Sequence, residues 1–244
     1  MKEAFAFRNS NGDSRAHSLN DRIDDRRHSD CEGRFELRTI GPIFLICGIA
    51  IAAVALNATP QTYAIDPARS RATIAVGKAG IFSFAAGHTH EVIAPSITGH
   101  MTVDPADPSR SMVRVTIDAS ALKVTGKGEP PDDVPRVQQT MVSEQVLDVR
   151  RYPTIDFDST SISVKNPGTT KLDLIINGRL TLHNVTRSVS VPVMVQIETH
   201  ELTSTGSFSL KQTDYGIKPI SVGGVVSVKD TVNVNFMIVG RLGG

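Results

Sequence analysis

The chain has 244 residues, which is enough for one substantial domain or two small ones. Its 26 Lys and Arg residues are balanced by 25 Asp and Glu residues, and the formal net charge is +1. This balance offers no extended basic surface, so we expect no nucleic-acid partner.

Residues 1–38 are dense in charged residues and lack apolar periodicity, which is typical of a disordered segment. The segment is too long and too acidic for the charged region that opens an ordinary signal peptide. An alternative explanation is a translation start assigned too far upstream, because a signal peptide would normally begin near Leu37 or Arg38.

Residues 39–58 form an uncharged apolar run that is typical of the central part of a signal peptide. Ala53-Val54-Ala55 has the small-residue pattern that signal peptidase cleaves, so we expect cleavage after Ala55 or Ala58. The mature chain would then be periplasmic or secreted, without either cysteine of the sequence. The alternative is an uncleaved membrane anchor with the domain facing the periplasm, since the run is just long enough to span a bilayer.

From Tyr63 onward, apolar and polar residues alternate along several runs, which predicts half-buried antiparallel strands. The residues assigned to inward faces are Val113, Val115, Ile117, Leu172, Leu174, Ile176, Leu180, Leu182, Val189, Val191, Val193, Val195, Ile197, Val232, Val234, Phe236 and Ile238. Many short strands with few helical segments indicate a sandwich or a closed barrel across residues 59–244.

Turn-forming residues separate these runs, at Asp104-Pro105, Asn166-Pro167-Gly168, His183-Asn184 and Gly223-Gly224. His183-Asn184 joins two long strands and predicts a tight hairpin in which Asn184 adopts a positive φ. Pro192 lies within a strand pattern and therefore predicts an edge, a bulge or the start of pairing at that point.

Residues 122–153 interrupt the strand pattern. They begin as a loop rich in Gly and Pro, and residues 136–149 then favour a helix. We expect this helix to be short and to cover one opening of the barrel, where it would control ligand entry.

A set of motifs occurs in order along this part of the chain: TYAIDPARSRATIAV, ITGHMTVDP, VRVTIDASAL, LDVRRYPTIDFDST, INGRLTLHNVT and QTDYGI. Together, from Tyr63 to Arg241, they resemble the YceI-like family of exported polyisoprenoid-binding proteins. The resemblance implies an all-β, lipocalin-like antiparallel barrel of about eight strands, a size whose interior can hold one slender ligand. The expected ligand is an isoprenoid or a related amphiphilic chain.

The segment Phe82–Val92, FSFAAGHTHEV, departs from the family pattern by its two histidines. If it is one continuous strand, His88 and His90 share a face with Phe82 and Phe84 and point into the barrel. We expect the two imidazoles to contact a ligand head or buried water without binding a metal, because a metal site needs three or four ligands.

Other metal ligands are not expected to join the pair. Glu91 falls on the opposite face, His100 is out of phase with its inward neighbours, and His183 lies in the predicted turn. The alternative hypothesis is an enzyme or redox partner that uses His88 and His90 to hold a metal or a quinone head.

The sequence therefore predicts a lipid-binding protein, with no enzymatic activity and no cofactor. Ser70, Ser120 and Ser159 lack the setting of a nucleophilic serine. The expected partner is a polyisoprenoid, a quinone or a fatty-acyl ligand, and contact with a membrane surface is a further expectation. The residues predicted to contact the ligand are Phe82, Phe84, His88, His90, Val113, Val115, Ile117, Phe157, Leu174, Ile176, Val193, Val195, Phe208, Tyr215 and Phe236.

Overall fold

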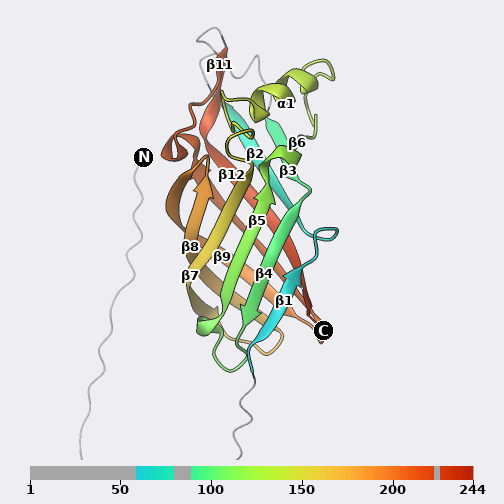
Figure 1. Cartoon of the computed structure of the whole chain (residues 1–244), viewed down its shortest axis with the longest axis vertical. Coiled ribbons are helices and arrows are strands. Elements are labelled where there is room, and N and C mark those ends of the chain that lie inside the picture. The colour runs from blue at the N-terminus through green and yellow to red at the C-terminus, as the bar shows by residue number, and fades with distance from the viewer. Residues whose placement is uncertain (1–58, 80–88, 223–225, 244) are drawn as a thin grey trace, which may run out of the picture. The chain divides into compact units, whose positions relative to one another are not determined.

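The structure, a computed structural model, describes residues 59–79, 89–222 and 226–243 (Figure 1). The predicted leader and apolar run, residues 1–58, lie outside these residues, as do Phe82, Phe84 and His88. No helix in the described ranges is both long and apolar enough to cross a membrane. The strands are β1 Gln61–Ile65, β2 Arg71–Ala79, β3 His90–Ala94, β4 Ile97–Val103, β5 Met112–Asp118, β6 Lys123–Val124, β7 Thr154–Asn166, β8 Lys171–Leu182, β9 Val185–Ile197, β10 Glu201–Lys211, β11 Ser221–Val222 and β12 Val226–Leu242.

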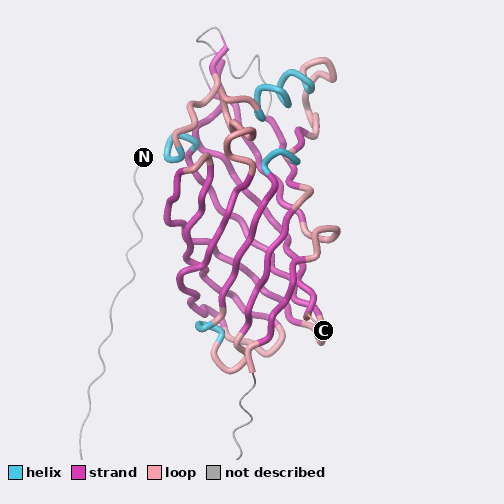
Figure 2. Tube along the Cα trace, viewed as in Figure 1, coloured by secondary structure: helices cyan, strands magenta, loops and turns pink. Residues whose placement is uncertain are grey.

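The strands close into an antiparallel barrel, which confirms the predicted fold class (Figure 2). Within the described residues, eight strands form the ring in the order β1, β4, β5, β7, β8, β9, β10, β12. The ring closes because Tyr63 of β1 pairs with Leu242 of β12 as well as with Met101 of β4.

The wall is built in two tiers, because β12 is long enough to pair with two strands along one edge. Its last residues pair with β1, and its earlier part, from Ser227 to Met237, pairs with β2. Strand β3 then pairs with β2, and β6 pairs with β3. We call the end of the barrel that β1 closes the first tier, and the end where β2, β3 and β6 form this part of the wall the second tier. The second tier extends the barrel wall beyond the end of β1.

The inward faces agree with the predicted alternation. Leu172, Leu174, Ile176, Leu180 and Leu182 of β8 are all buried, as are the alternate valines of β9 from Val191 to Val195. Because successive side chains of a strand point to opposite faces, their polar neighbours lie outside. On that outer face, Asp158 pairs with Arg114, and Asp156 accepts a hydrogen bond from Thr116.

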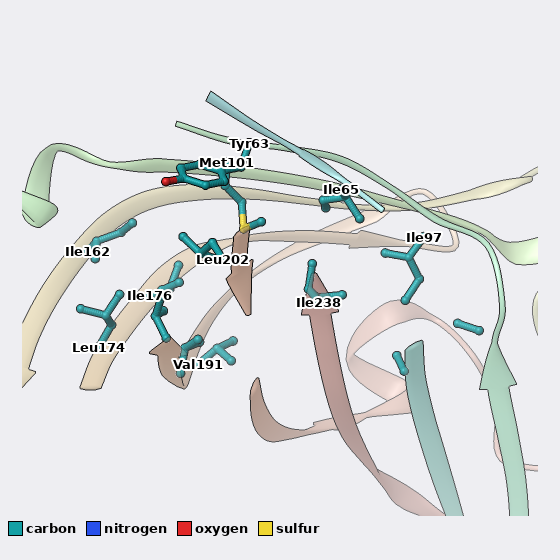
Figure 3. Packing of buried hydrophobic residues seen from close by; sticks show 14 of the residues in the cluster. Tyr63, Ile65, Ile97, Met101, Ile162, Leu174, Ile176, Val191, Leu202 and Ile238 are labelled. Carbon is teal, nitrogen blue, oxygen red and sulfur yellow. The ribbon is translucent and has the colours of Figure 1, made fainter. Parts of the chain in front are cut away.

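The first-tier half of the barrel is filled by its own side chains (Figure 3). Tyr63, Met101 and Leu202 meet there with Ile162, Ile176 and Ile238, so that residues from six strands share one cluster. Each of these side chains is at most 7% exposed. Close packing of this kind leaves no room for a ligand in that half.

Two turn predictions are confirmed. His183 and Asn184 adopt φ values of 52° and 59°, and Leu182 pairs with Val185 across this two-residue turn. Pro192 marks the point at which β9 leaves β10, because their pairing ends with Val193 opposite Gly206. A proline fits there since it has no N–H to donate to the missing partner.

The helix prediction was partly wrong. The helix α1 covers Val134–Val142, and residues 143–152 form turns instead of continuing it. The helix ends because the hydroxyl and the N–H of Ser143 both donate to the carbonyl of Thr140. A serine that hydrogen-bonds the nearby backbone in this way competes with the helical pattern. Short 3₁₀ helices lie at Pro108–Arg110, Ala119–Ala121 and Gln212–Tyr215.

Candidate functional site

A cavity of about 530 Å³ lies in the second-tier half of the barrel, where residues of β2, β3 and α1 contribute to its lining. Its volume lies within the range of about 300–1,000 Å³ that is typical of small-molecule sites. The apolar residues that line it on β2, β5, β8, β10 and β12 are Ala72, Ile74, Val76, Ile117, Leu180, Leu182, Phe208, Leu210, Val228, Val232 and Val234. A continuous apolar lining of this kind favours the hydrocarbon part of a ligand over water.

The inward rows of β8 and β12 are each divided between the cavity and the packed half. On β8, Leu180 and Leu182 line the cavity, whereas Leu174 and Ile176 belong to the packed cluster. On β12, the same division falls between Val234 and Ile238.

Two phenylalanine–glycine pairs lie at the level of this division. A side chain at Gly178 of β8 would overlap the ring of Phe157, and one at Gly206 of β10 would overlap the ring of Phe236. Each ring therefore fills the space that its glycine leaves on the neighbouring strand. Neither ring lines the cavity itself, so we infer that the two pairs support its floor from just below the last lining residues of β8, β10 and β12.

Most polar side chains of the lining lie near α1. They come from β2, β3, the loop before α1, the helix itself and the turn after it: Lys78, His90, Glu129, Asp133, Arg136, Thr140 and Gln145. Gln212 and Ser227 are the other polar residues of the lining within the described part of the chain. Arg136 is paired with Asp133 at 2.9 Å. The cavity thus has an apolar part and a polar part, which is the arrangement that an amphiphilic ligand requires.

Glu129 reaches the cavity through a glycine-rich turn. Gly126 and Gly128 have φ values of 73° and 77°, and the N–H of Glu129 donates to the carbonyl of Gly126. Glycine adopts such positive φ values at little cost. At Gly126 a side chain would also press against Val134, so this turn depends on glycine for two reasons.

The carboxylate of Glu129 is buried beside His90. Its side chain is 1% exposed, and Oε1 lies 3.1 Å from Nδ1 of His90. The approach lacks hydrogen-bond alignment, and neither carboxylate oxygen has a hydrogen-bond partner within the described residues. Nδ1 of His90 is also buried and likewise has no hydrogen-bond partner among the described residues. Buried polar atoms are nearly always hydrogen-bonded, so these three atoms are exceptional.

The predicted ligand-contacting residues divide into four groups. His90, Ile117 and Phe208 line the cavity. Phe82, Phe84 and His88 lie outside the described residues. Phe157 and Phe236 lie just beyond the lining, packed against the core cluster, and Tyr215 is buried behind the lining beside Leu180 and Ile217. The rest belong to the packed half or its margin: Val113, Val115, Leu174, Ile176, Val193 and Val195.

A second hollow of about 340 Å³ lies where β9 and β10 separate. It is lined by residues of both strands, including Arg187 and Ser190, and by Tyr215. Phe208 and Leu210 line both this hollow and the main cavity. These two side chains therefore form the partition between the cavity and the gap in the wall.

The described residues hold no group of three or more His, Cys, Asp and Glu side chains that could bind a metal ion. His100 is exposed, and Glu91 contacts Lys127 and Thr125 outside the cavity, as the strand phase predicted. His183 lies in the hairpin turn, where its ring meets Tyr152 edge to face.

Glu129 is the polar group that the sequence reasoning missed. It lies in a loop that was predicted only as a connection, and 38 residues separate it from His90. The sequence did carry one signal for this residue. Glu129 is a single acidic residue between Gly126-Lys127-Gly128 and Pro130-Pro131, and a turn of this composition restricts the backbone and so the direction of the side chain.

A closed antiparallel barrel with an internal, largely apolar cavity is the architecture of the lipocalin-like binding proteins. The chain belongs to the YceI-like domain family, whose model matches residues 63–240. This match confirms the resemblance drawn from the motifs.

The relatives agree with this assignment. A UPF0312 protein of Shewanella sp. strain W3-18-1 is 28% identical over 175 residues, covering 68% of this chain and 81% of its own. Among solved structures, Burkholderia cenocepacia BcnA aligns with a TM-score of 0.55 and 19% identity, covering 72% of this chain and 98% of its own. A polyisoprenoid binding domain from Saccharophagus degradans aligns at 0.54 and 12% identity, covering 75% and 99%. Likenesses of this kind show the fold.

Proposed function

We propose that this protein binds the hydrocarbon chain of a polyisoprenoid or a similar amphiphile in the barrel cavity, and that it acts as a binding protein rather than an enzyme. The observation that carries the proposal is the largely apolar cavity that β2, β5, β8, β10 and β12 enclose together with α1. Two further facts support it. The chain belongs to the YceI-like domain family, and the Saccharophagus degradans domain of similar fold is described as polyisoprenoid-binding.

Burial of the chain supplies the binding free energy. Each CH₂ group moved from water into an apolar interior gains about 0.8 kcal/mol, so a five-carbon isoprene unit gains about 4 kcal/mol before ordering costs. Affinity should therefore depend mainly on the length of the chain that the cavity accepts. The polar head would adjust affinity and select among ligands of equal length.

Export is part of the proposal. The apolar run before the barrel, with Ala53-Val54-Ala55 near its end, favours a signal peptide and a periplasmic or secreted protein. N-terminal sequencing of the protein recovered outside the cytoplasm should give a start near Leu56 or Thr59. A soluble extracytoplasmic form that begins at Met1 would contradict this part of the proposal.

The first prediction concerns chain length. Isoprenoid alcohols with one to five isoprene units should bind with affinities that rise with each unit until the cavity is full, and then level off. Isothermal titration of the barrel with this series measures the effect. Native mass spectrometry of protein purified from its own host provides an independent test, because a retained lipid adds its own mass. Affinity that does not change with chain length would contradict chain binding in the cavity.

A further inference from the structure

The pair formed by Glu129 and His90 lies in the polar part of the cavity, where three buried polar atoms lack a hydrogen-bond partner within the described residues. An unpaired carboxylate inside a protein is costly unless some group donates hydrogen bonds to it. The side chain of Glu129 is 1% exposed and lines the cavity, directly after a turn in which Gly126 and Gly128 have positive φ. The carboxylate is therefore held where a ligand, and not the barrel itself, can provide the donor.

We propose that Glu129 and His90 form a head-group site that accepts a hydrogen bond from an uncharged hydroxyl, such as that of an alcohol or a phenol at the end of the bound chain. The inference rests on the proposed function, because the chain must occupy the apolar part of the cavity. An ionised carboxylate accepts hydrogen bonds and donates none, so a head that only accepts would leave its oxygens unpaired.

The buried carboxylate disfavours an anionic head. An anionic head such as a phosphate would lie against the carboxylate of Glu129, and like charges in a buried site repel strongly. Arg136, on the same lining, is already paired with Asp133. A neutral donor avoids the repulsion that an anion would meet and supplies a hydrogen bond to the free oxygens.

The geometry also orients the ligand. The polar part is built from β2, β3, the Gly126–Glu129 turn and α1, whereas Leu180, Phe208 and Val234 line the apolar part on β8, β10 and β12. A chain whose hydroxyl meets Glu129 would therefore extend along these strands toward the floor. This orientation places the head beneath the helix.

The test compares three ligands that share one chain: geranylgeraniol, its methyl ether and its monophosphate. Hydrogen bonds to charged groups are worth about 1.5–3 kcal/mol, so wild-type protein should bind the alcohol roughly 10- to 100-fold more tightly than the ether. The monophosphate should bind more weakly than the alcohol. In Glu129→Leu, the alcohol and the ether should bind equally well.

Asp132→Asn is the matched control, because Asp132 is an exposed carboxylate of the same loop that does not line the cavity. It should keep the preference for the alcohol. The wild-type comparison requires no mutation, so it stays decisive even if a variant fails to fold. Equal wild-type affinities for alcohol and ether would overturn the inference. Tightest binding of the monophosphate would also overturn it and would assign recognition to Lys78 and Arg136. Failure of all three ligands to bind would instead contradict the proposed function.

Discussion

At the scale of single residues, the buried polar atoms without hydrogen-bond partners among the described residues are of two kinds: those that a ligand can reach and those that it cannot. Glu129 is buried within the cavity lining, where a ligand can reach it. The hydroxyl of Tyr215 is likewise buried without a hydrogen-bond partner in the described part of the chain, but it lies behind the lining. Burial, followed by the negative charge of Asp214, raises the pKa of Tyr215 above its usual value. Its hydroxyl is therefore a cost to folding rather than a binding group.

This difference leads to a prediction for Tyr215→Phe. The unfolded chain releases the tyrosine proton near pH 10, whereas the folded chain holds it to higher pH, so the free energy of unfolding should fall as the pH rises above about 10. The variant should lack this contribution, and at neutral pH it should be at least as stable as wild type because no hydrogen bond is lost. Urea denaturation between about pH 8 and pH 11 measures both effects.

Tyr63→Phe serves as the control for the neutral-pH result. Tyr63 is also buried, but its hydroxyl donates to Oε1 of Gln61 at 3.0 Å, so this variant should be destabilised. If Tyr215→Phe and wild type lost stability in parallel above pH 10, the raised pKa of Tyr215 would not contribute to folding.

At the scale of elements, α1 is held to the barrel by one side chain that bonds two backbone groups. Nε2 of Gln138 donates to the carbonyl of Leu122 at 2.9 Å, and its Oε1 accepts from the N–H of Val124 at 2.8 Å. On the same helix, Val137 and Met141 face the cavity. The helix thus depends on Gln138 and on apolar contacts to cover the polar part of the site.

We expect Gln138→Leu to loosen this cover while leaving the barrel intact. The change keeps the size of the side chain but removes two hydrogen bonds, each worth about 1 kcal/mol. Amide exchange across residues 125–150 should become faster, and a bound isoprenoid should dissociate faster. Hydrogen exchange and stopped-flow release measure the two effects.

The neighbouring variant Gln139→Leu is the matched control, because Gln139 is exposed on the same helix. It should leave both rates unchanged. If amide exchange and ligand release became equally faster in both variants, helix propensity or surface polarity would hold α1 in place. The hydrogen bonds from Gln138 to the backbone of Leu122 and Val124 would then not be responsible.

At the scale of the whole molecule, the barrel is half filled and half open. The side chains of the first tier close-pack, and the two phenylalanine–glycine pairs lie where the cavity ends. We therefore expect these rings to limit the length of chain that fits. The apolar pattern of the strands is the same on both sides of the level where the cavity ends, so this pattern alone does not determine that level.

Phe236→Ala should deepen the cavity. Removal of the ring opposite Gly206 leaves space that neither residue can fill, so affinity should continue to rise for a longer isoprenoid before it levels off. The free energy of unfolding should fall by less than the roughly 3–5 kcal/mol that loss of a fully buried aromatic ring costs, because Phe236 is partly buried. Titration with the chain-length series and urea denaturation measure these changes.

Leu174→Ala separates the two effects. Leu174 is 8% exposed within the packed half, so its truncation should cost about 2–5 kcal/mol of stability without changing the preferred chain length. An unchanged preference in Phe236→Ala, with a similar loss of stability, would show that the ring of Phe236 is not the floor.

The sequence by itself determined most of the barrel. The alternation in β8, β9 and β12 identified the strands and their inward faces, because the two-residue period of a strand is a local property. His183-Asn184 and Pro192 were read correctly for the same reason, since backbone preferences depend on the residue itself. The ordered motifs also identified the family.

Only the tertiary structure decided where the open space lies and what faces it. Leu174 and Leu182 have the same periodicity on one strand, yet one packs in the filled half and the other lines the cavity. Their difference depends on the summed volume of side chains from all the surrounding strands, including the rings that cover Gly178 and Gly206. Glu129 meets His90 because the pairing of β6 with β3 and the turn at Gly126 bring a loop over a strand end. No single segment specifies that contact, since it arises only when distant parts of the chain pack together.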